Sequence, residues 1–200
     1  MKHLEAGNPA IPFSATTIDG QSWDLVALQG QPMLINLFRY TGCPLCSLSY
    51  WYLIEKYPAW HARGLQVVTV FEAKREDVQR FATKHGMPFP VIADAEHRIY
   101  RQYGADTSWW GFFWGFIRRR KNYAESRQRG LANSAINGTI NRMPSQFLVT
   151  PELTIDTAHY GKDFGDFLAF EAIESFLARY SPTPVTTSSE VNTSSINREQ

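Results

Sequence analysis

Short apolar blocks alternate with amphipathic stretches along most of the chain. Residues Met33–Phe38 are apolar at nearly every position, which is typical of a central strand that is covered on both faces. Residues 43–63 carry apolar side chains at steps of three and four, which predicts a helix that Pro58 should kink or break. Residues 65–71 form the next apolar block and predict a second central strand.

The remaining pattern completes an α/β arrangement. It predicts a hairpin over 11–28, helices over 76–85 and 99–103, strands over 91–93, 147–149 and 153–160, and a last helix capped by Asp166. Strands that alternate with helices imply a parallel sheet with right-handed crossovers, and the closing β-β-α unit adds an antiparallel edge. We therefore expect one α/β domain over residues 1–180, in which helices flank a central mixed sheet.

Two segments interrupt this pattern. Residues 105–141 hold six aromatic residues within 109–116, followed by the basic run 118–121, and this segment carries a net charge of +4 while the rest of the chain carries −3. We interpret it as an aromatic and basic insert. Residues 181–200 are rich in Ser and Thr and contain no aromatic residue, which predicts a disordered tail.

The composition restricts the classes of function. The chain has 200 residues, of which 44% are hydrophobic and 20% are charged, so an ordinary core can form. A formal net charge of +1 argues against nucleic acid as a partner. No apolar run approaches the roughly 20 residues that span a bilayer, and no apolar signal region follows the N-terminus. We therefore expect a cytoplasmic protein without a transmembrane segment.

The only two cysteines of the sequence, Cys43 and Cys46, form a C-x-x-C pair directly after the strand at 33–38. They open the following helix, where unpaired backbone N–H groups and the macrodipole favour the reactive thiolate form. The second thiol comes about one helical turn later on the same face, within reach of a disulfide. A zinc site would need about four ligands. Because the histidines are scattered, we expect redox chemistry without a metal or a cofactor.

Neighbouring residues are expected to support the pair. Pro44 lies in the first helical turn, where it costs no hydrogen bond and stiffens the helix entry. Arg39 is expected to add positive charge near Cys43, and Tyr40 or Thr41 to supply a hydrogen-bond donor. Arg142, by contrast, is expected to be a solvated side chain.

A strand, a C-x-x-C pair at a helix start and a later β-β-α unit resemble the thioredoxin superfamily. Pro144, close before the strand at 147–149, looks like the cis-proline of that superfamily, which packs beside the active thiols. Within the superfamily, the chain is most similar to peroxiredoxin-like proteins with an AhpC/TSA domain that carry a C-x-x-C motif. The features that carry this similarity are the N-terminal hairpin, Arg39-Tyr40-Thr41-Gly42-Cys43-Pro44-Leu45-Cys46, Pro88-Phe89-Pro90-Val91-Ile92-Ala93-Asp94, Gly115-Phe116-Ile117 and Tyr160-Gly161-Lys162-Asp163-Phe164-Gly165-Asp166.

The resemblance implies a thioredoxin-like fold with a peroxiredoxin-type hairpin. It also implies a thiol–disulfide oxidoreductase in which Cys43, the more exposed cysteine, attacks and Cys46 resolves. The implied partners are a thioredoxin- or glutathione-like reductant and a hydroperoxide or disulfide substrate. Peroxiredoxins hold Thr or Ser three residues before the attacking cysteine and Pro seven before it, whereas this chain holds Tyr40 and Asn36. The Pro144 loop stands where that family has its peroxide-activating arginine. These departures predict that disulfide exchange is faster than peroxide turnover.

The aromatic insert leaves further roles open. Its Trp and Phe side chains beside a basic run would suit a membrane interface, or they pack over the thiols as a lid, or they form a homodimer surface. We favour the lid or the homodimer, because apolar residues without a long polar face favour burial against protein. The alternative to an enzyme is a redox-sensing binding protein, in which disulfide formation moves the insert and changes its contact with a partner or a membrane.

Overall fold

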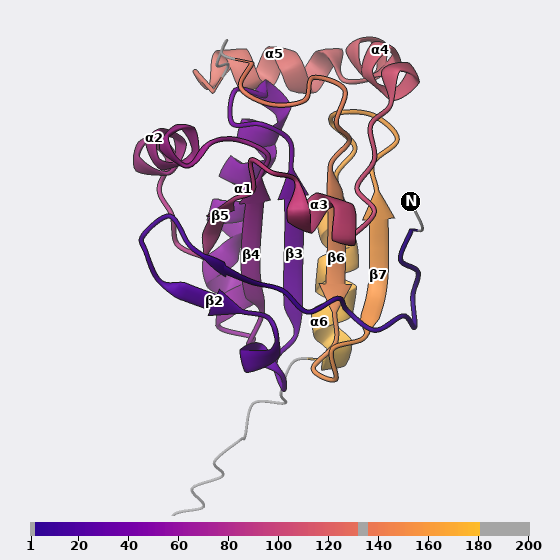
Figure 1. The fold of residues 1–200 in the computed structure, drawn as a ribbon. Coiled ribbons are helices and arrows are strands. Elements are labelled where there is room, and N and C mark those ends of the chain that lie inside the picture. Colours follow the sequence, from indigo (N-terminus) through magenta and orange to yellow (C-terminus); the bar gives the residue numbers. More distant parts are fainter. Residues whose placement is uncertain (1–2, 132–135, 181–200) are drawn as a thin grey trace, which may run out of the picture.

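A five-stranded mixed sheet forms the centre of the computed structural model, which describes residues 3–131 and 136–180. The strand order is β5-β4-β3-β6-β7 (Figure 1), with β3 (Met33–Phe38), β4 (Gln66–Phe71), β5 (Val91–Ala93), β6 (Ser145–Val149) and β7 (Ile155–Tyr160). Strand β3 pairs in parallel with β4 and antiparallel with β6. The sheet thereby confirms the predicted parallel core with an antiparallel edge. The predicted tail, 181–200, lies outside the described residues.

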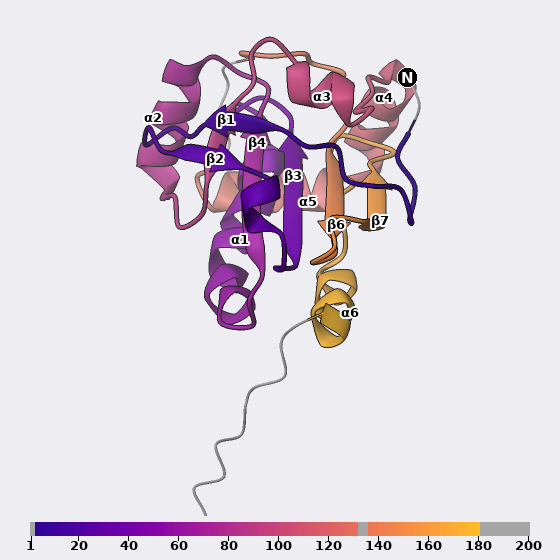
Figure 2. The same ribbon diagram turned by 60° about the horizontal axis from the view of Figure 1, so that its bottom comes forward.

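Helices and a small hairpin cover the two faces of the sheet (Figure 1 and Figure 2). One face packs against α1 (Pro44–His61), α2 (Arg75–His85) and α6 (Phe170–Tyr180); the other packs against the hairpin β1 (Ser14–Thr16) and β2 (Ser22–Asp24), the 3-10 turn η1 (Val26–Leu28) and α3 (Arg98–Gln102). Successive residues of β3 point to opposite faces of the sheet. Leu34 and Phe38 belong to the core under α1, while Ile35 and Leu37 belong to the core under the hairpin and α3. This double coverage explains why β3 is apolar almost throughout.

Two expectations about helix ends are wrong. Pro58 does not break helix α1, which continues to His61, because the proline lies in the last turn and removes only one hydrogen bond there; a kink at Pro58 stays a prediction. Helix α6 begins at Phe170, not at Asp166, whose carboxylate instead accepts a hydrogen bond from the backbone N–H of Lys162 at 2.9 Å.

The aromatic and basic insert folds into two further helices, α4 (Trp109–Arg118) and α5 (Arg120–Gln128). They lie at the top of Figure 1, with α5 above the carboxyl ends of β3 and β4 and α4 to its right, above β6 and β7. Helix α5 packs beside the first turns of α1, where the Ser126 hydroxyl donates a hydrogen bond to the Pro44 carbonyl at 3.1 Å. Within residues 3–131 and 136–180, every helix is too short or too polar to cross a membrane.

Two glycines fix the orientation of α4 against the domain. A Cβ atom at Gly111 would lie 2.4 Å from the Lys162 carbonyl oxygen, and one at Gly115 would lie 2.4 Å from the Phe164 ring. Because the two glycines are four residues apart, they share one face of the helix. This face is therefore the one that contacts the loop before α6, and the opposite face points away from it.

Replacing Gly111 with Ala is expected to destabilise the protein by about 1–2 kcal/mol, because the clash with a backbone oxygen outweighs the gain in helix propensity. Urea unfolding measures this loss. The control is Phe113→Ala on the outward face of α4, which should change stability by less than about 0.5 kcal/mol. A Gly111→Ala protein more stable than wild type would show that α4 is not held against Lys162.

Candidate functional site

Cys43 and Cys46 lie where β3 ends and α1 begins. Cys43 is the N-cap residue of α1, and its sulfur accepts a hydrogen bond from the backbone N–H of Cys46 at 3.4 Å. Both thiols are free. The link of four residues between Phe38 and Cys43 turns the chain at the carboxyl end of a central strand, which is where open α/β sheets hold their sites.

Arg39 supplies the charge nearest to the first thiol. Its guanidinium Nη1 donates a hydrogen bond to the Cys43 sulfur at 3.2 Å, and Nη2 donates to the Ile140 carbonyl. The guanidinium carbon lies 5.1 Å from the centre of the Tyr40 ring and 5.2 Å from that of Phe164. The Nε atom is buried and makes no hydrogen bond within the described part of the chain. Arg39 is therefore held between two rings, with one donor directed at the sulfur.

These contacts separate the acidities of the two thiols. Burial raises the pKa of Cys43, but the hydrogen bond from the Cys46 thiol, the Arg39 charge and the backbone N–H groups of α1 outweigh it and lower the pKa to about 6. Burial, followed by the neighbouring Cys43 sulfur, raises the pKa of Cys46 well above its ordinary value. At neutral pH, Cys43 is thus a thiolate and Cys46 a thiol that can donate a proton to it.

Replacing Arg39 with Leu is expected to move the pH midpoint for alkylation of Cys43 upward from about 6 by roughly 1–3 units, because the thiolate loses both the neighbouring positive charge and a hydrogen-bond donor. The thiolate fraction at the wild-type midpoint should fall by about fivefold or more. Rates of iodoacetamide labelling over a pH series, read by mass spectrometry, measure the shift. Arg101→Leu, which removes an exposed arginine on α3, is the control. An unchanged midpoint in Arg39→Leu would contradict this role.

The expectation that Cys43 is an exposed thiol is wrong, because its side chain is only 1% accessible. The insert and the loop before α6 cover it and leave a cavity of about 240 Å³ beside it. The walls of this cavity are mainly apolar: Tyr40, Pro44, Leu45, Phe112, Phe116, Tyr123, Ile136, Ile140 and Phe164, with Arg39, Gly42 and Cys43. The lid role expected for the insert is therefore met by Phe112 and Phe116, which line the cavity.

The structure shows where three residues with expected supporting roles lie. The Thr41 hydroxyl accepts a hydrogen bond from the Asn137 amide at 2.8 Å, and the described residues show no hydrogen bond from it to Cys43. The phenol of Tyr40 lines the cavity, and burial followed by the nearby Cys43 sulfur raises its pKa to about 12. The peptide bond before Pro144 is trans, so the expected cis-proline is not found. Backbone hydrogen bonds hold the extended chain there: the Met143 N–H donates to the Asp106 carbonyl, and the Gly161 N–H donates to the Pro144 carbonyl.

A buried ion pair behind the site was missed from the sequence. Arg142 is not solvated: it is 7% exposed, its Nε bonds to the Glu72 carboxylate, and its Nη1 donates to the Ala105 carbonyl at 2.7 Å. Glu72 also accepts from the backbone N–H of Thr139 at 2.9 Å and lies 3.1 Å from the ring nitrogen of His97. This carboxylate thus anchors the segment 137–142, whose Ile140 carbonyl binds Arg39. Its position directly after strand β4 was a signal that could have identified it.

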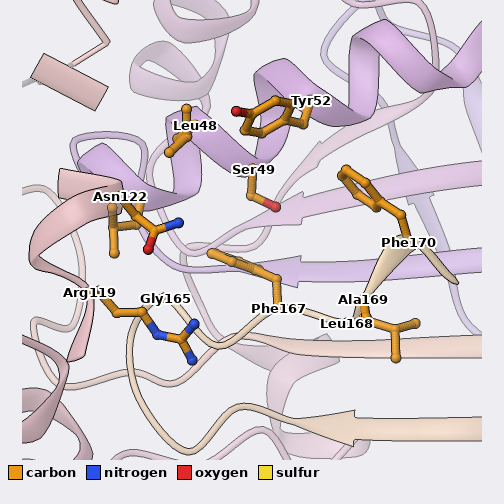
Figure 3. A pocket seen from close by; sticks show the side chains of 11 residues that line it. Leu48, Ser49, Tyr52, Arg119, Asn122, Gly165, Phe167, Leu168, Ala169 and Phe170 are labelled. Atoms are coloured by element: carbon orange, nitrogen blue, oxygen red, sulfur yellow. The ribbon is translucent and has the colours of Figure 1, made fainter. Parts of the chain in front are cut away.

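A second hollow of about 230 Å³ lies on the neighbouring side of α1. Figure 3 shows Leu48, Ser49 and Tyr52 of α1 on one side of it, Arg119 and Leu168 on the other, and Phe167 between them. Leu45 lines both hollows, but no cysteine lines this one. We therefore place the thiol chemistry in the Cys43 cavity. Among the described residues, no three His, Cys, Asp or Glu side chains gather as a metal site.

A C-x-x-C pair at the helix start after the central strand of such a sheet defines a thioredoxin-like, thiol-dependent oxidoreductase. The model of the AhpC/TSA family matches residues 6–158, and the chain belongs to that family. It is 29% identical to peroxiredoxin Bcp of Escherichia coli K12 over 111 residues, which cover 56% of this chain and 69% of that protein. It is also 29% identical to the thiol-disulfide oxidoreductase ResA of Bacillus anthracis over 103 residues, or 50% of this chain and 58% of ResA.

Solved structures share the fold. Peroxidoxin BcpB of Mycobacterium tuberculosis superposes with a TM-score of 0.62 at 12% identity, covering 88% of this chain and 96% of that one. A thiol:disulfide interchange protein of the thioredoxin family from Chlorobium tepidum gives a TM-score of 0.55 at 18% identity, covering 88% and 99%. The family and the fold confirm the resemblance stated from the sequence: the chain is a peroxiredoxin-like thiol–disulfide oxidoreductase.

Proposed function

We propose that Cys43 is the attacking thiolate and Cys46 the resolving thiol of a cycle in which the protein reduces disulfides. The observation that carries this assignment is the asymmetry of the pair: Arg39 and the Cys46 backbone both donate to the Cys43 sulfur, and the pKa of Cys43 is lowered while that of Cys46 is raised. A thiolate attacks and a neighbouring thiol completes the exchange.

In the first step, the Cys43 thiolate attacks one sulfur of the substrate disulfide. A Cys43–substrate disulfide forms, the substrate S–S bond breaks, and the released thiolate takes up a proton. Cys46 then loses its proton and attacks the Cys43 sulfur, which forms the Cys43–Cys46 disulfide and releases the second substrate thiol. The protein has given up two electrons, and one thioredoxin-like dithiol or two glutathione-like thiols restore the Cys43–Cys46 dithiol by the reverse exchange and are themselves oxidised to a disulfide.

The surroundings of the sulfur favour disulfides over peroxides as substrates. Cleavage of a peroxide needs donors for the negative charge that develops on oxygen. Neither Tyr40 nor Thr41 donates to Cys43 in the structure, and Arg142 is committed to Glu72 and to the Ala105 carbonyl. The mainly apolar cavity suits the side chains around a protein disulfide. We keep a cytoplasmic location as a prediction from the sequence.

Initial rates with a model disulfide and with hydrogen peroxide, each with an excess of reductant, test this proposal. We expect the second-order rate constant to be larger for the disulfide, and both activities to disappear in Cys43→Ser. A peroxide rate constant of about 10⁷ M⁻¹s⁻¹ or more, in the range of very efficient enzymes, would overturn the preference. It would mean that Arg39, whose Nε is unpartnered among the described residues, supplies the missing donor.

A further inference from the structure

The outward side of α4 exposes a continuous apolar surface. At 100° per residue, its members span about 160° of the helix circumference. We call this surface the aromatic face; it consists of Trp109, Trp110, Phe113, Trp114, Phe116 and Ile117. Trp110 is 74% exposed, Ile117 64% and Phe113 62%. Within the single chain these six side chains are therefore not buried as a lid, except that Phe116 also lines the Cys43 cavity; their burial across a homodimer stays a prediction.

The aromatic face cannot turn inward. Gly111 and Gly115 hold the opposite side of α4 against Lys162 and Phe164 with no room for a Cβ atom. Any rotation about the helix axis would bring a large side chain into that contact. The exposure is thus fixed by packing and is not one of several equivalent rotations, and a patch of this kind on a folded protein marks an interaction site.

The charge around the aromatic face has one dominant sign. Exposed cations follow it at the end of α4 and along α5: Arg118, Arg120, Lys121 and Arg127. Between Trp109 and Gln128 the sequence holds one acidic residue, Glu125, and it pairs with Arg129 at 3.0 Å. The basic residues therefore remain largely uncompensated on this side of the molecule.

We propose that the aromatic face docks on the headgroup region of an anionic bilayer. Trp and Phe side chains suit that depth, and the adjoining Arg and Lys side chains meet the negative surface of the lipid. The helix forms an outer corner of the molecule, at the upper right of Figure 1 above the side of the sheet that β6 and β7 form, which gives the aromatic face free access to a flat surface. This inference does not depend on the proposed disulfide chemistry.

A second copy of the chain fits the same surface less well. Two aromatic faces packed around a two-fold axis would bring both basic clusters together, and like charges at that distance repel. An anionic lipid surface has the opposite charge and compensates the same cations. Charge complementarity therefore selects the bilayer over the homodimer.

Docking would place the thiol cavity beside the membrane. Phe112 and Phe116 line the Cys43 cavity, and Phe116 also belongs to the aromatic face. One helix thereby joins the entrance of the cavity to the lipid-facing surface. Substrates held in or on the bilayer would then reach Cys43 without diffusing through the bulk solvent.

Flotation of the full chain with vesicles tests the proposal. The vesicles are phosphatidylcholine alone, or phosphatidylcholine with about one third phosphatidylglycerol. We expect the wild-type protein to float with the anionic vesicles and to bind the neutral ones weakly. Quenching of Trp fluorescence by brominated lipid should accompany binding, because Trp109, Trp110 and Trp114 would enter the interface.

Two pairs of variants locate the binding surface. Trp110→Ser/Phe113→Ser should weaken vesicle binding by about tenfold or more, since apolar area is lost from the interface, whereas Val26→Ser, at an exposed apolar side chain of η1, should not. Arg120→Glu/Lys121→Glu should weaken it by about 30-fold or more, because each cation near an anionic surface contributes about fivefold. Lys56→Glu/Lys84→Glu, which makes the same charge change on α1 and α2, should have a much smaller effect.

Sedimentation equilibrium and circular dichroism accompany the flotation. Retained folding and an unchanged oligomeric state in the variants that lose binding would support the docking surface. The proposal is overturned if wild type does not float, or if the α4 and α5 variants float as well as their controls. A wild-type dimer that dissociates in Trp110→Ser/Phe113→Ser, without vesicle binding, would assign the aromatic face to a second copy instead.

Discussion

Replacing Cys43 with Ser is expected to lower the rate of disulfide reduction by at least about 10³-fold, because the hydroxyl stays protonated at neutral pH and cannot replace the thiolate. The fold should survive, since the substitution changes one buried atom. Steady-state turnover of a model disulfide with excess reductant measures the loss, and a thermal unfolding curve close to that of wild type shows that the fold is intact.

Cys46→Ser is the matched variant at the other end of the pair. It leaves the Cys43 thiolate and Arg39 in place, so the first exchange should still occur. The mixed disulfide between Cys43 and the substrate should then accumulate, because no resolving thiol follows. Mass spectrometry of the protein after one equivalent of substrate detects this adduct. If Cys46→Ser turned over at the wild-type rate while Cys43→Ser formed the adduct, the two roles would have to be exchanged.

Most of the central fold could be predicted because its signals are local. Strand β3 has the predicted bounds, Met33–Phe38, since a strand buried on both faces is apolar at almost every position. The C-x-x-C pair and Arg39 could also be found, because their positions depend only on the strand end and the helix start that flank them. The same local reasoning placed Pro44 correctly in the first turn of α1.

The insert could not be predicted in the same way. Its aromatic residues show no alternation with polar ones, so the sequence pattern does not tell a buried segment from an exposed helix. What decides the outcome is contact of Gly111 and Gly115 with Lys162 and Phe164, about 50 residues away in the sequence. The burial of Cys43 has the same cause, because the covering residues come from distant segments such as Phe112 and Phe164.

The ion pair between Glu72 and Arg142 likewise depends on tertiary structure, and it leads to a large expected effect on stability. Glu72 is fully buried and Arg142 nearly so, and the Arg142 guanidinium also lies 5.3 Å from the centre of the Tyr100 ring. Arg142→Leu removes the cation and leaves the buried Glu72 carboxylate without a positively charged partner. The free energy of unfolding is expected to fall by about 3–5 kcal/mol, which is typical when one partner of a buried pair is lost. Urea denaturation of the reduced protein measures this change.

The double variant Glu72→Leu/Arg142→Leu separates the unpaired charge from lost packing. It should be more stable than Arg142→Leu alone, because no uncompensated charge remains in the core. Since Glu72 also binds the Thr139 backbone, Arg142→Leu should loosen the segment that carries Ile140 and make Cys43 alkylate faster. The prediction fails if the free energy of unfolding of Arg142→Leu lies within about 0.5 kcal/mol of the wild-type value and the alkylation rate of Cys43 is unchanged. The pair would then neither stabilise the fold nor hold the cover over the thiols.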